Sequence, residues 1–203
     1  MTALLAVTMC LPLAIAERPD FEADALQLRV HPTLVPEGHP LSTVNGVFNA
    51  ILVEGEPLGQ VMLYGPGAGA GATASAVVSD IVHIVGLLHS DKTIQETTEQ
   101  TLNPLLGCSH AHYSTTLPID TLKTRFYARF LSQDLPGVIG DLGTCFGQHQ
   151  VSLESVVQIG LQDDCAEIVV VTHDVYEANF REALAEIQGL EAIKDVPSIL
   201  RVL

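Results

Sequence analysis

Residues Arg125–Leu203 follow a strand–helix–strand–strand–helix–strand pattern, which few folds can accommodate. In the first strand, Phe126, Ala128 and Phe130 occupy alternate positions, as expected where one face of a strand is buried. Three later strands are expected at Val151–Gly160, Ala166–Thr172 and Ile193–Val202. The pattern predicts a ferredoxin-like βαββαβ sheet with both helices on one face.

Two helices are expected between these strands. The first should run from Asp134 through Gly147, because Asp134 suits a helix cap and Pro136 suits a first turn. The second should begin at Asp174, with Glu177 three residues later completing a capping box. Its buried stripe should consist of Phe180, Leu184, Ile187 and Leu190.

A second motif is a glycine-rich loop between an apolar strand and an apolar helix. Its glycines stand at alternate positions, namely Gly65, Gly67, Gly69 and Gly71. Glycine lets the backbone approach a ligand closely, and a helix start offers unpaired N–H groups, so an anion such as a phosphate is the expected guest. The loop fits G-x-G-x-x-A, and Asp91 lies roughly 20 residues further on, as in a dinucleotide-binding unit.

The surroundings of this loop leave three interpretations open. A polar run, Ser90–Gln100, stands where a βαβ unit would have its second strand, and Pro66 has no N–H to offer a phosphate. The loop could belong to a complete nucleotide-binding unit, or be a plain turn between strand and helix. The favoured interpretation is a loop that contacts a nucleotide held mainly by another part of the protein.

The first half of the chain should contribute short strands and one long helix. Strands are expected at Leu11–Ala16 and Ala25–Pro32, and Val47–Val53 should pair with Gly59–Tyr64 as a hairpin. The helix Ala72–Leu88 has a broad apolar face, which predicts burial against more than one neighbour. The chain offers little to supply the second neighbour.

The N-terminus allows a competing hypothesis. Met1–Ala16 is nearly all apolar, and its end resembles a signal-peptide cleavage site at Ala16. No basic residue precedes Arg18, and the run is too short to span a bilayer comfortably. We therefore expect a buried strand in a cytoplasmic protein, with secretion as the less favoured alternative.

The charge and the cysteines limit the partners. With 24 acidic against nine basic residues, the net charge of −15 argues against nucleic-acid binding, which needs a basic surface. The four cysteines show no paired spacing, which is typical of reduced thiols. Cys108, His110 and His112 could approach a soft metal, but no fourth ligand follows, so we expect a connecting segment and no metal site.

Two stretches resemble known families. Leu28–Val44, Asn45–Glu54 and the following YGPGAGAGATASAVVSDI closely resemble the carboxyl half of homoserine dehydrogenase. Residues Phe126–Leu203, with DLPGV at Asp134–Val138 and the closing VPSILRVL, resemble the ACT domain that follows it in many bacterial enzymes. The resemblance covers about Leu13 to Leu203 and is weak across the connecting segment.

The resemblance implies an α+β protein with two parts. Residues 1–90 would be the carboxyl-terminal remnant of the mixed α/β catalytic domain, 91–121 a linker, and 122–203 an ACT regulatory domain of ferredoxin-like βαββαβ fold. The family's nucleotide domain, catalytic lysine and substrate carboxylates find no match in this chain. The three lysines, Lys92, Lys123 and Lys194, lie outside the family's catalytic setting, so no catalytic residue is assigned.

Functional residues are carried over from the resemblance. In the family a glycine of the loop contacts NADP or NAD; it corresponds to Gly69, and Gly67 is assigned with it. Thr73 is expected to cap the helix.

In ACT domains a small amino acid binds between paired subunits. Here the resemblance implies that Asp134 would face the ammonium group of the amino acid. The N–H groups near Gly137, Val138 and Ile139 would bind its carboxylate. Gln150 and Ser152 of the partner subunit would complete the pocket. The alternative role of Asp134 is a helix cap.

The resulting hypothesis is a homoserine dehydrogenase piece that senses an amino acid, with threonine the expected effector and a homodimer formed through the ACT or the remnant domain. Its parent would interconvert L-aspartate 4-semialdehyde and L-homoserine with NAD(P)H in threonine, methionine and isoleucine biosynthesis. The piece alone should be inactive. The alternative is a stand-alone ACT module that binds an amino acid. No nucleic acid or membrane partner is expected, and His31, His39, His83 and His149 are interpreted as structural.

Overall fold

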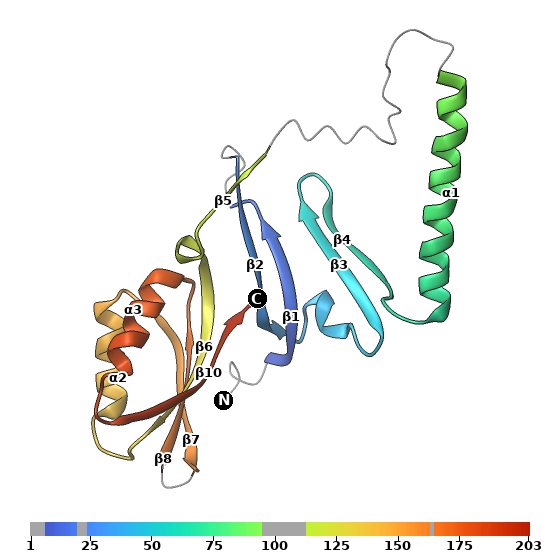
Figure 1. The fold of residues 1–203 in the computed structure, drawn as a ribbon. Helices are drawn as coiled ribbons and strands as arrows, with labels where there is room; N and C mark the ends of the chain where they lie inside the picture. Colours follow the sequence, from blue (N-terminus) through green and yellow to red (C-terminus); the bar gives the residue numbers. More distant parts are fainter. Residues whose placement is uncertain (1–6, 20–23, 95–112, 163–164) are drawn as a thin grey trace. The chain divides into compact units, whose positions relative to one another are not determined.

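The computed structural model describes residues 7–19, 24–94, 113–162 and 165–203 of the chain (Figure 1). The chain divides into two compact units. One unit contains Met1–Ser42 and Ser114–Leu203, and the other contains Thr43–Tyr113. The first unit therefore combines both ends of the chain, whereas the second is one continuous segment.

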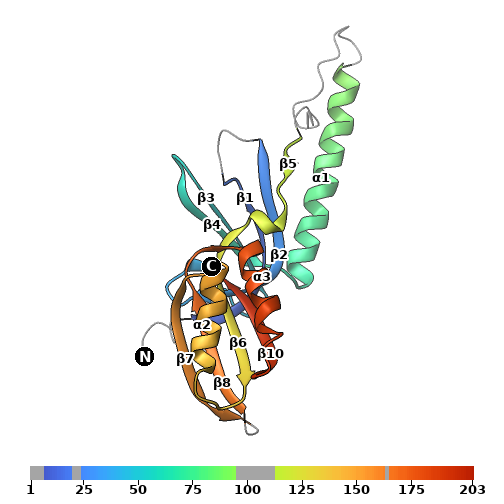
Figure 2. The same cartoon turned by 90° about the vertical axis from the view of Figure 1, so that its left-hand side faces the viewer.

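A mixed sheet forms the first unit. Its strands follow the order β1-β2-β10-β6-β8-β7. Their bounds are β1 Val7–Glu17, β2 Ala25–Pro36, β6 Lys123–Ser132, β7 Leu153–Gln162, β8 Cys165–Thr172 and β10 Ile193–Val202. The helices α2 (Val138–Gln148) and α3 (Glu177–Ile187) lie beside each other (Figure 2).

The part from β6 to β10 has the predicted ferredoxin-like arrangement. The elements follow the order β6, α2, β7, β8, α3, β10, and the strands are arranged β10-β6-β8-β7. Phe126, Ala128 and Phe130 are buried as predicted, and Phe180 stacks on Phe126 with ring centroids 4.0 Å apart. Both helices contribute to this core, so they cover the same face of the sheet.

The first two strands extend this sheet. β1 pairs with β2 in antiparallel register, and β2 pairs with β10 in parallel through Thr33 opposite Arg201 and Leu34 opposite Val202. The expected strands at 11–16 and 25–32 are confirmed and are longer than predicted, but the first is not buried as expected, because residues 11–16 alternate between half-buried and exposed. The predicted linker is partly ordered, because β5 (Thr115–Thr116) pairs with β2 and a 3-10 helix spans Ile119–Thr121. The predicted boundaries at 90 and 121 remain predictions.

A buried ion cluster lies where β2 meets β10. Glu177 is 2% exposed, and its carboxylate accepts hydrogen bonds from Arg201 Nη2 at 2.6 Å and from Arg181 Nε at 2.9 Å. The Arg201 guanidinium also lies over the Phe126 ring, 5.9 Å from its centroid. Burial lowers the pKa of His31, and the nearby Arg201 charge lowers it further.

Both predicted helix starts in this unit are wrong. α2 begins at Val138, not at Asp134, because Gly137 adopts a left-handed conformation (φ 100°) immediately before it. α3 begins at Glu177, because Val175–Tyr176 forms the short strand β9 against Lys123 and Thr124 and keeps the chain extended. The predicted capping box is therefore absent, and Glu177 serves the ion cluster instead.

The second unit consists of a hairpin and a helix. The hairpin strands β3 (Phe48–Gly55) and β4 (Gly59–Pro66) pair in antiparallel register, as predicted. α1 runs from Ala70 to Ile94, so the expected end at Leu88 is wrong; no proline or glycine lies between Leu88 and Ile94 to stop it. Its apolar side chains are exposed, with Ile81 at 54% and Val82 at 62%. No helix in the described part of the chain is long and apolar enough to cross a membrane.

Candidate functional site

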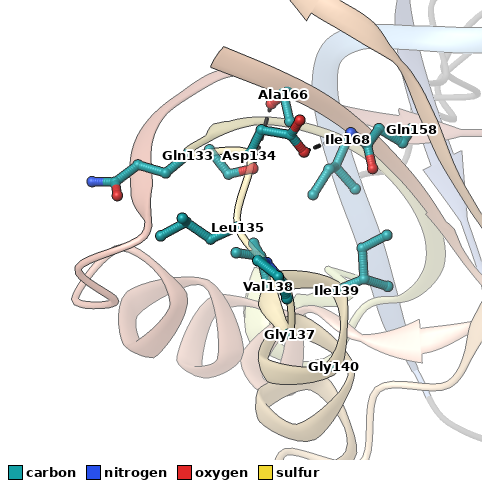
Figure 3. A pocket seen from close by; sticks show the side chains of 12 residues that line it. Gln133, Asp134, Leu135, Gly137, Val138, Ile139, Gly140, Gln158, Ala166 and Ile168 are labelled. Carbon is teal, nitrogen blue, oxygen red and sulfur yellow. Dashed lines mark hydrogen bonds between the residues drawn. The ribbon is translucent and has the colours of Figure 1, made fainter. Parts of the chain in front are cut away.

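A cavity of about 230 Å³ lies between the end of β6 and the start of α2 (Figure 3). Binding sites for drug-sized ligands measure roughly 300–1,000 Å³, so this cavity suits a smaller molecule. Its lining comes from the β6–α2 connection, the first turn of α2, and residues of β7 and β8. The lining residues are Ser132, Gln133, Asp134, Leu135, Pro136, Gly137, Val138, Ile139, Gly140, Gln158, Ala166 and Ile168.

The first turn of α2 supplies backbone donors to this cavity. Gly137 is the N-cap and provides no side-chain cap, and its carbonyl accepts the first helical hydrogen bond from Asp141 N at 2.9 Å. The N–H groups of Val138, Ile139 and Gly140 precede that bond, so they have no acceptor within the helix. The helix dipole places partial positive charge at the same end. This wall of the cavity therefore suits a carboxylate.

Asp134 supplies the opposite charge. Figure 3 shows its carboxylate directed toward Gln158 on β7, whose Nε2 donates to Asp134 Oδ1 at 3.3 Å. Asp134 is therefore not the cap of α2, which was the alternative interpretation, because α2 starts four residues later. A carboxylate near a set of free N–H groups can recognise a molecule that carries both an ammonium and a carboxylate.

The structure brings four of the six predicted effector residues to this cavity, namely Asp134, Gly137, Val138 and Ile139. Gln150 and Ser152 do not line it. They follow the far end of α2, where Gln150 N donates to Gly147 O and Ser152 O accepts from His173 N. Their expected contribution from a partner subunit remains a prediction.

Sequence reasoning did not identify Ser132, Gln158, Ala166 and Ile168 as lining residues. Ala166 and Ile168 alternate along β8, so their inward direction could have been read from the strand period. Gln158 had no such signal, because only the pairing of β7 with β8 brings it toward Asp134.

The glycine loop forms the second candidate site. Gly69 has a φ of 124°, a conformation that favours glycine, and its carbonyl accepts from Thr73 N at 3.0 Å. Thr73 therefore lies inside the first turn of α1, not at its cap. Among the described residues, apart from the two chain neighbours, no atom lies within 4 Å of the position that a Cβ on Gly69 would take. This open position fits the close approach of a nucleotide cofactor.

Gly67 differs from Gly69. A Cβ on Gly67 would overlap Nδ2 and Cγ of Asn49 and would lie 2.7 Å from its Oδ1. The Gly67 N–H donates to Val47 O at 2.9 Å, which ties the loop to the start of the hairpin. The space beside Gly67 is therefore filled by Asn49, and the assignment of Gly67 to the cofactor remains a prediction.

The other polar clusters are structural links. His149 Nε2 lies 2.7 Å from Glu186 Oε2, joining α2 to α3. The hydrogen bond with His149 lowers the pKa of the Glu186 carboxyl, while burial raises the pKa of the neighbouring Cys145 thiol. A thiol with a raised pKa is a poor nucleophile. Among the residues that the structure describes, no group of three or more metal-ligating side chains could hold an ion. The alternative metal ligands Cys108, His110 and His112 lie outside the described residues.

Comparison with known proteins gives two family matches. Residues 7–82 match the homoserine dehydrogenase family, and residues 126–192 match the ACT domain. A homoserine dehydrogenase from Synechocystis is 61% identical over 182 residues, which are 90% of this chain and 41% of that protein. One from Neisseria gonorrhoeae is 36% identical over 87% of this chain and 40% of its own length.

A solved structure agrees with these matches. The crystal structure of a homoserine dehydrogenase from Thiobacillus denitrificans aligns with a TM-score of 0.76 and 31% identity. The alignment covers 96% of this chain and 42% of that one. This chain thus spans about two fifths of the length of the relatives it matches.

The fold and the two family matches define a segment similar to part of homoserine dehydrogenase, joined to an ACT domain, a domain class that binds amino acids. The strands, glycine loop and helix over residues 7–82 lie in the part that matches homoserine dehydrogenase, and the cavity at α2 lies in the part that matches the ACT domain. The chain belongs to the homoserine dehydrogenase family.

Proposed function

We propose that this chain works as the regulatory part of a homoserine dehydrogenase, the enzyme that interconverts L-aspartate 4-semialdehyde and L-homoserine in the biosynthesis of threonine, methionine and isoleucine. The observation that supports this proposal best is the joint match to the enzyme family and to the ACT domain within one chain. NADP or NAD would supply or accept the hydride. Within this chain, Gly69 is the residue proposed to lie against that cofactor, because its Cβ side is open.

The chain alone should not catalyse the reaction. Two of its three lysines, the exposed Lys123 and Lys194, lie at the ends of β6 and β10, in a different compact unit from the glycine loop. The third, Lys92, lies near the end of α1, more than 20 residues after Gly69. The purified chain should therefore oxidise no NADPH when L-aspartate 4-semialdehyde is added. Absorbance at the nicotinamide band, followed with and without the semialdehyde, measures this directly, and turnover above the no-protein control would contradict the proposal.

The cavity at α2 is the proposed effector site. In this arrangement Asp134 accepts hydrogen bonds from the ligand ammonium, while the N–H groups at Val138 and Ile139 bind its carboxylate. The cavity volume of about 230 Å³ suits a small amino acid, and threonine is the proposed ligand as an end product of the pathway. We also propose a cytoplasmic homodimer, in which Gln150 and Ser152 of one subunit complete the site of the other.

Calorimetry tests the effector site. Threonine, isoleucine and methionine are each titrated into the full chain, and into an Asp134→Asn variant that keeps the shape of the side chain. Threonine should release or absorb heat with the unmodified chain and bind at least tenfold more weakly to D134N, because one charge-assisted hydrogen bond is lost. No heat with any of the three amino acids would exclude the proposed sensing of these ligands.

The second candidate function is a stand-alone ACT module that binds an amino acid and acts on another protein. The ordered ferredoxin-like core supports it, because that core does not depend on the hairpin and α1. Amino-acid binding without NADPH turnover agrees with both candidates. They are separated by adding the chain to a full-length homoserine dehydrogenase, whose response to threonine changes only if the chain acts on it.

A further inference from the structure

The glycine loop is accompanied by a polar side chain that neither the motif nor the resemblance singles out. Asn49 lies on β3, opposite Gly65 of β4 in the antiparallel register. Its amide occupies the space that a Cβ on Gly67 would need. The glycine at position 67 therefore leaves room for the Asn49 amide. Gly67 is two residues before Gly69, where the position of a Cβ is open.

The surroundings hold this part of the hairpin in place. Gly67 N donates to Val47 O at 2.9 Å, and the rings of Phe48 and Tyr64 stack with centroids 4.8 Å apart and planes 9° apart. Both strands are thus fixed on either side of Asn49. The position of the Asn49 amide beside the loop is therefore fixed, because the backbone of β3 and Gly67 are both held by these contacts.

The amide also has unused hydrogen-bonding capacity. An asparagine side chain offers one acceptor oxygen and two N–H donors, and no hydrogen bond joins those of Asn49 to another residue within the described ranges. Asn45 provides a contrast in the same unit, since its Nδ2 donates to Thr43 O at 3.1 Å. Asn49 is exposed, so a bound molecule can reach it.

We propose that Asn49 is a cofactor-binding residue that hydrogen-bonds the ribosyl-nicotinamide half of the dinucleotide admitted at Gly69. This half carries hydroxyl groups and a carboxamide, which match a side chain with both donors and an acceptor, whereas a phosphate could use only the donors. The inference rests on the proposed contact between Gly69 and the cofactor. The Asn49 side chain would supply the polar group that orients the ligand beside the backbone of Gly69, which has no side chain of its own.

Nuclear magnetic resonance of the ¹⁵N-labelled full chain tests the inference without an activity assay. NADP⁺, nicotinamide mononucleotide and ADP are titrated separately, while the Asn49 side-chain amide and the Gly69 backbone amide are followed. NADP⁺ and the mononucleotide, added in large excess because the family's nucleotide domain has no match in this chain, should shift both signals, and ADP should leave the Asn49 signal in place. Asn49→Ala should weaken the binding measured at Gly69 about fivefold to tenfold, the effect of one lost hydrogen bond. Asn45→Ala is the matched control and should leave it unchanged.

The outcomes separate the inference from the proposed function. A shift at Gly69 without a shift at Asn49, or equal affinity in Asn49→Ala, overturns the inference and leaves the Gly69 contact standing. No shift at either position overturns both. Gly67→Ala gives an independent check, because the added Cβ must displace the amide. Its loss of affinity should match that of Asn49→Ala, and the double variant should be no weaker than either single one. Additive losses would contradict the proposed role.

Discussion

His31 combines partial burial with two nearby guanidinium groups. Burial lowers its pKa below the ordinary value of 6.5, Arg201 and Arg29 add to this effect, and the Pro32 carbonyl and Glu177 oppose it. The neutral imidazole is therefore favoured in the folded chain. The unfolded chain binds a proton more readily, so the stability contributed by neutral His31 is complete above pH 6.5 and is lost as the pH falls toward the folded pKa.

The free energy of unfolding of the unmodified chain should fall between pH 7.5 and pH 5.5. In His31→Gln it should fall less over the same range, because the imidazole that takes up the proton is gone. Urea unfolding at each pH, followed by circular dichroism, measures the difference between the variant and the unmodified chain. His173→Gln, which alters an exposed histidine, is the control and should keep the original slope. A His31→Gln chain with the same pH dependence as the unmodified chain would contradict this assignment.

Glu177 is the most buried charged side chain of the ion cluster. It forms ion pairs with both Arg201 and Arg181, and Arg201 is only 20% exposed. Glu177→Gln removes the charge and leaves Arg201 partly buried without its partner. This should lower the free energy of unfolding by about 3 kcal/mol. The matched variant Glu182→Gln removes a 70% exposed carboxylate and should change it by less than about 0.5 kcal/mol. Equal effects in urea unfolding would refute the role of the cluster.

At the scale of the elements, periodicity predicted most of the fold. The alternation on β6 and the hairpin signals around residues 54–59 identified the strands, and β10 matches its predicted range of 193–202. The helix starts failed where local chemistry suggested a cap but the backbone was held extended, by β9 in one case and by the left-handed Gly137 in the other.

Contacts between distant segments were beyond sequence reasoning. The parallel pairing of β2 with β10 joins residues separated by more than 160 positions, and neither strand carries a local signal for it. For the same reason Gln158 was absent from the predicted effector site, and Asn49 was absent from the predicted cofactor site. Four of the predicted residues line the same cavity because they come from one short segment, 134–139, next to a helix start; their binding of an effector remains a prediction.

The helix α1 gives a prediction at this scale. Val78, Ile81 and Val82 lie on one side of it and are each more than half exposed. Exposed apolar stripes promote association, so the purified chain should be larger than its 21.7 kDa monomer in light scattering. Replacing the three residues by glutamine, a good helix former, should shift the protein toward the monomer. Ala76→Gln with His83→Gln, on the opposite side of the helix, is the control and should not. A monodisperse monomer of the unmodified chain would contradict the prediction.

At the scale of the whole molecule, the two compact units are made from interleaved parts of the chain. Val35, Thr33 and Gln27 of β2 are almost fully buried within the unit that contains the ACT domain. The strands that precede the hairpin thus stabilise the ACT domain as well as themselves. Removing them would uncover the edge of β10 and the Glu177–Arg201 pair.

Two shortened chains test this dependence. A chain that begins at residue 113 should unfold several degrees below the full chain, because the 11 residues of β1 and the 12 residues of β2 are missing from the sheet. A second chain, in which residues 43–113 are replaced by a flexible glycine–serine linker, keeps β1 and β2 and should retain the original midpoint. Thermal unfolding followed by circular dichroism compares them. Equal midpoints for the two chains would show that β1 and β2 contribute nothing.

The pairing of β2 with β10 also dictates an order of events on the ribosome. Leu34 accepts a hydrogen bond from the N–H of Leu203, which lies 169 positions further along the chain, so its partner is synthesised much later. The hairpin of β1 and β2 must therefore wait, with one edge unpaired, until β10 has been synthesised and has left the exit tunnel. During that interval its apolar strands are open to pairing with other nascent chains, and chaperones that shield strand edges should raise the yield of folded protein.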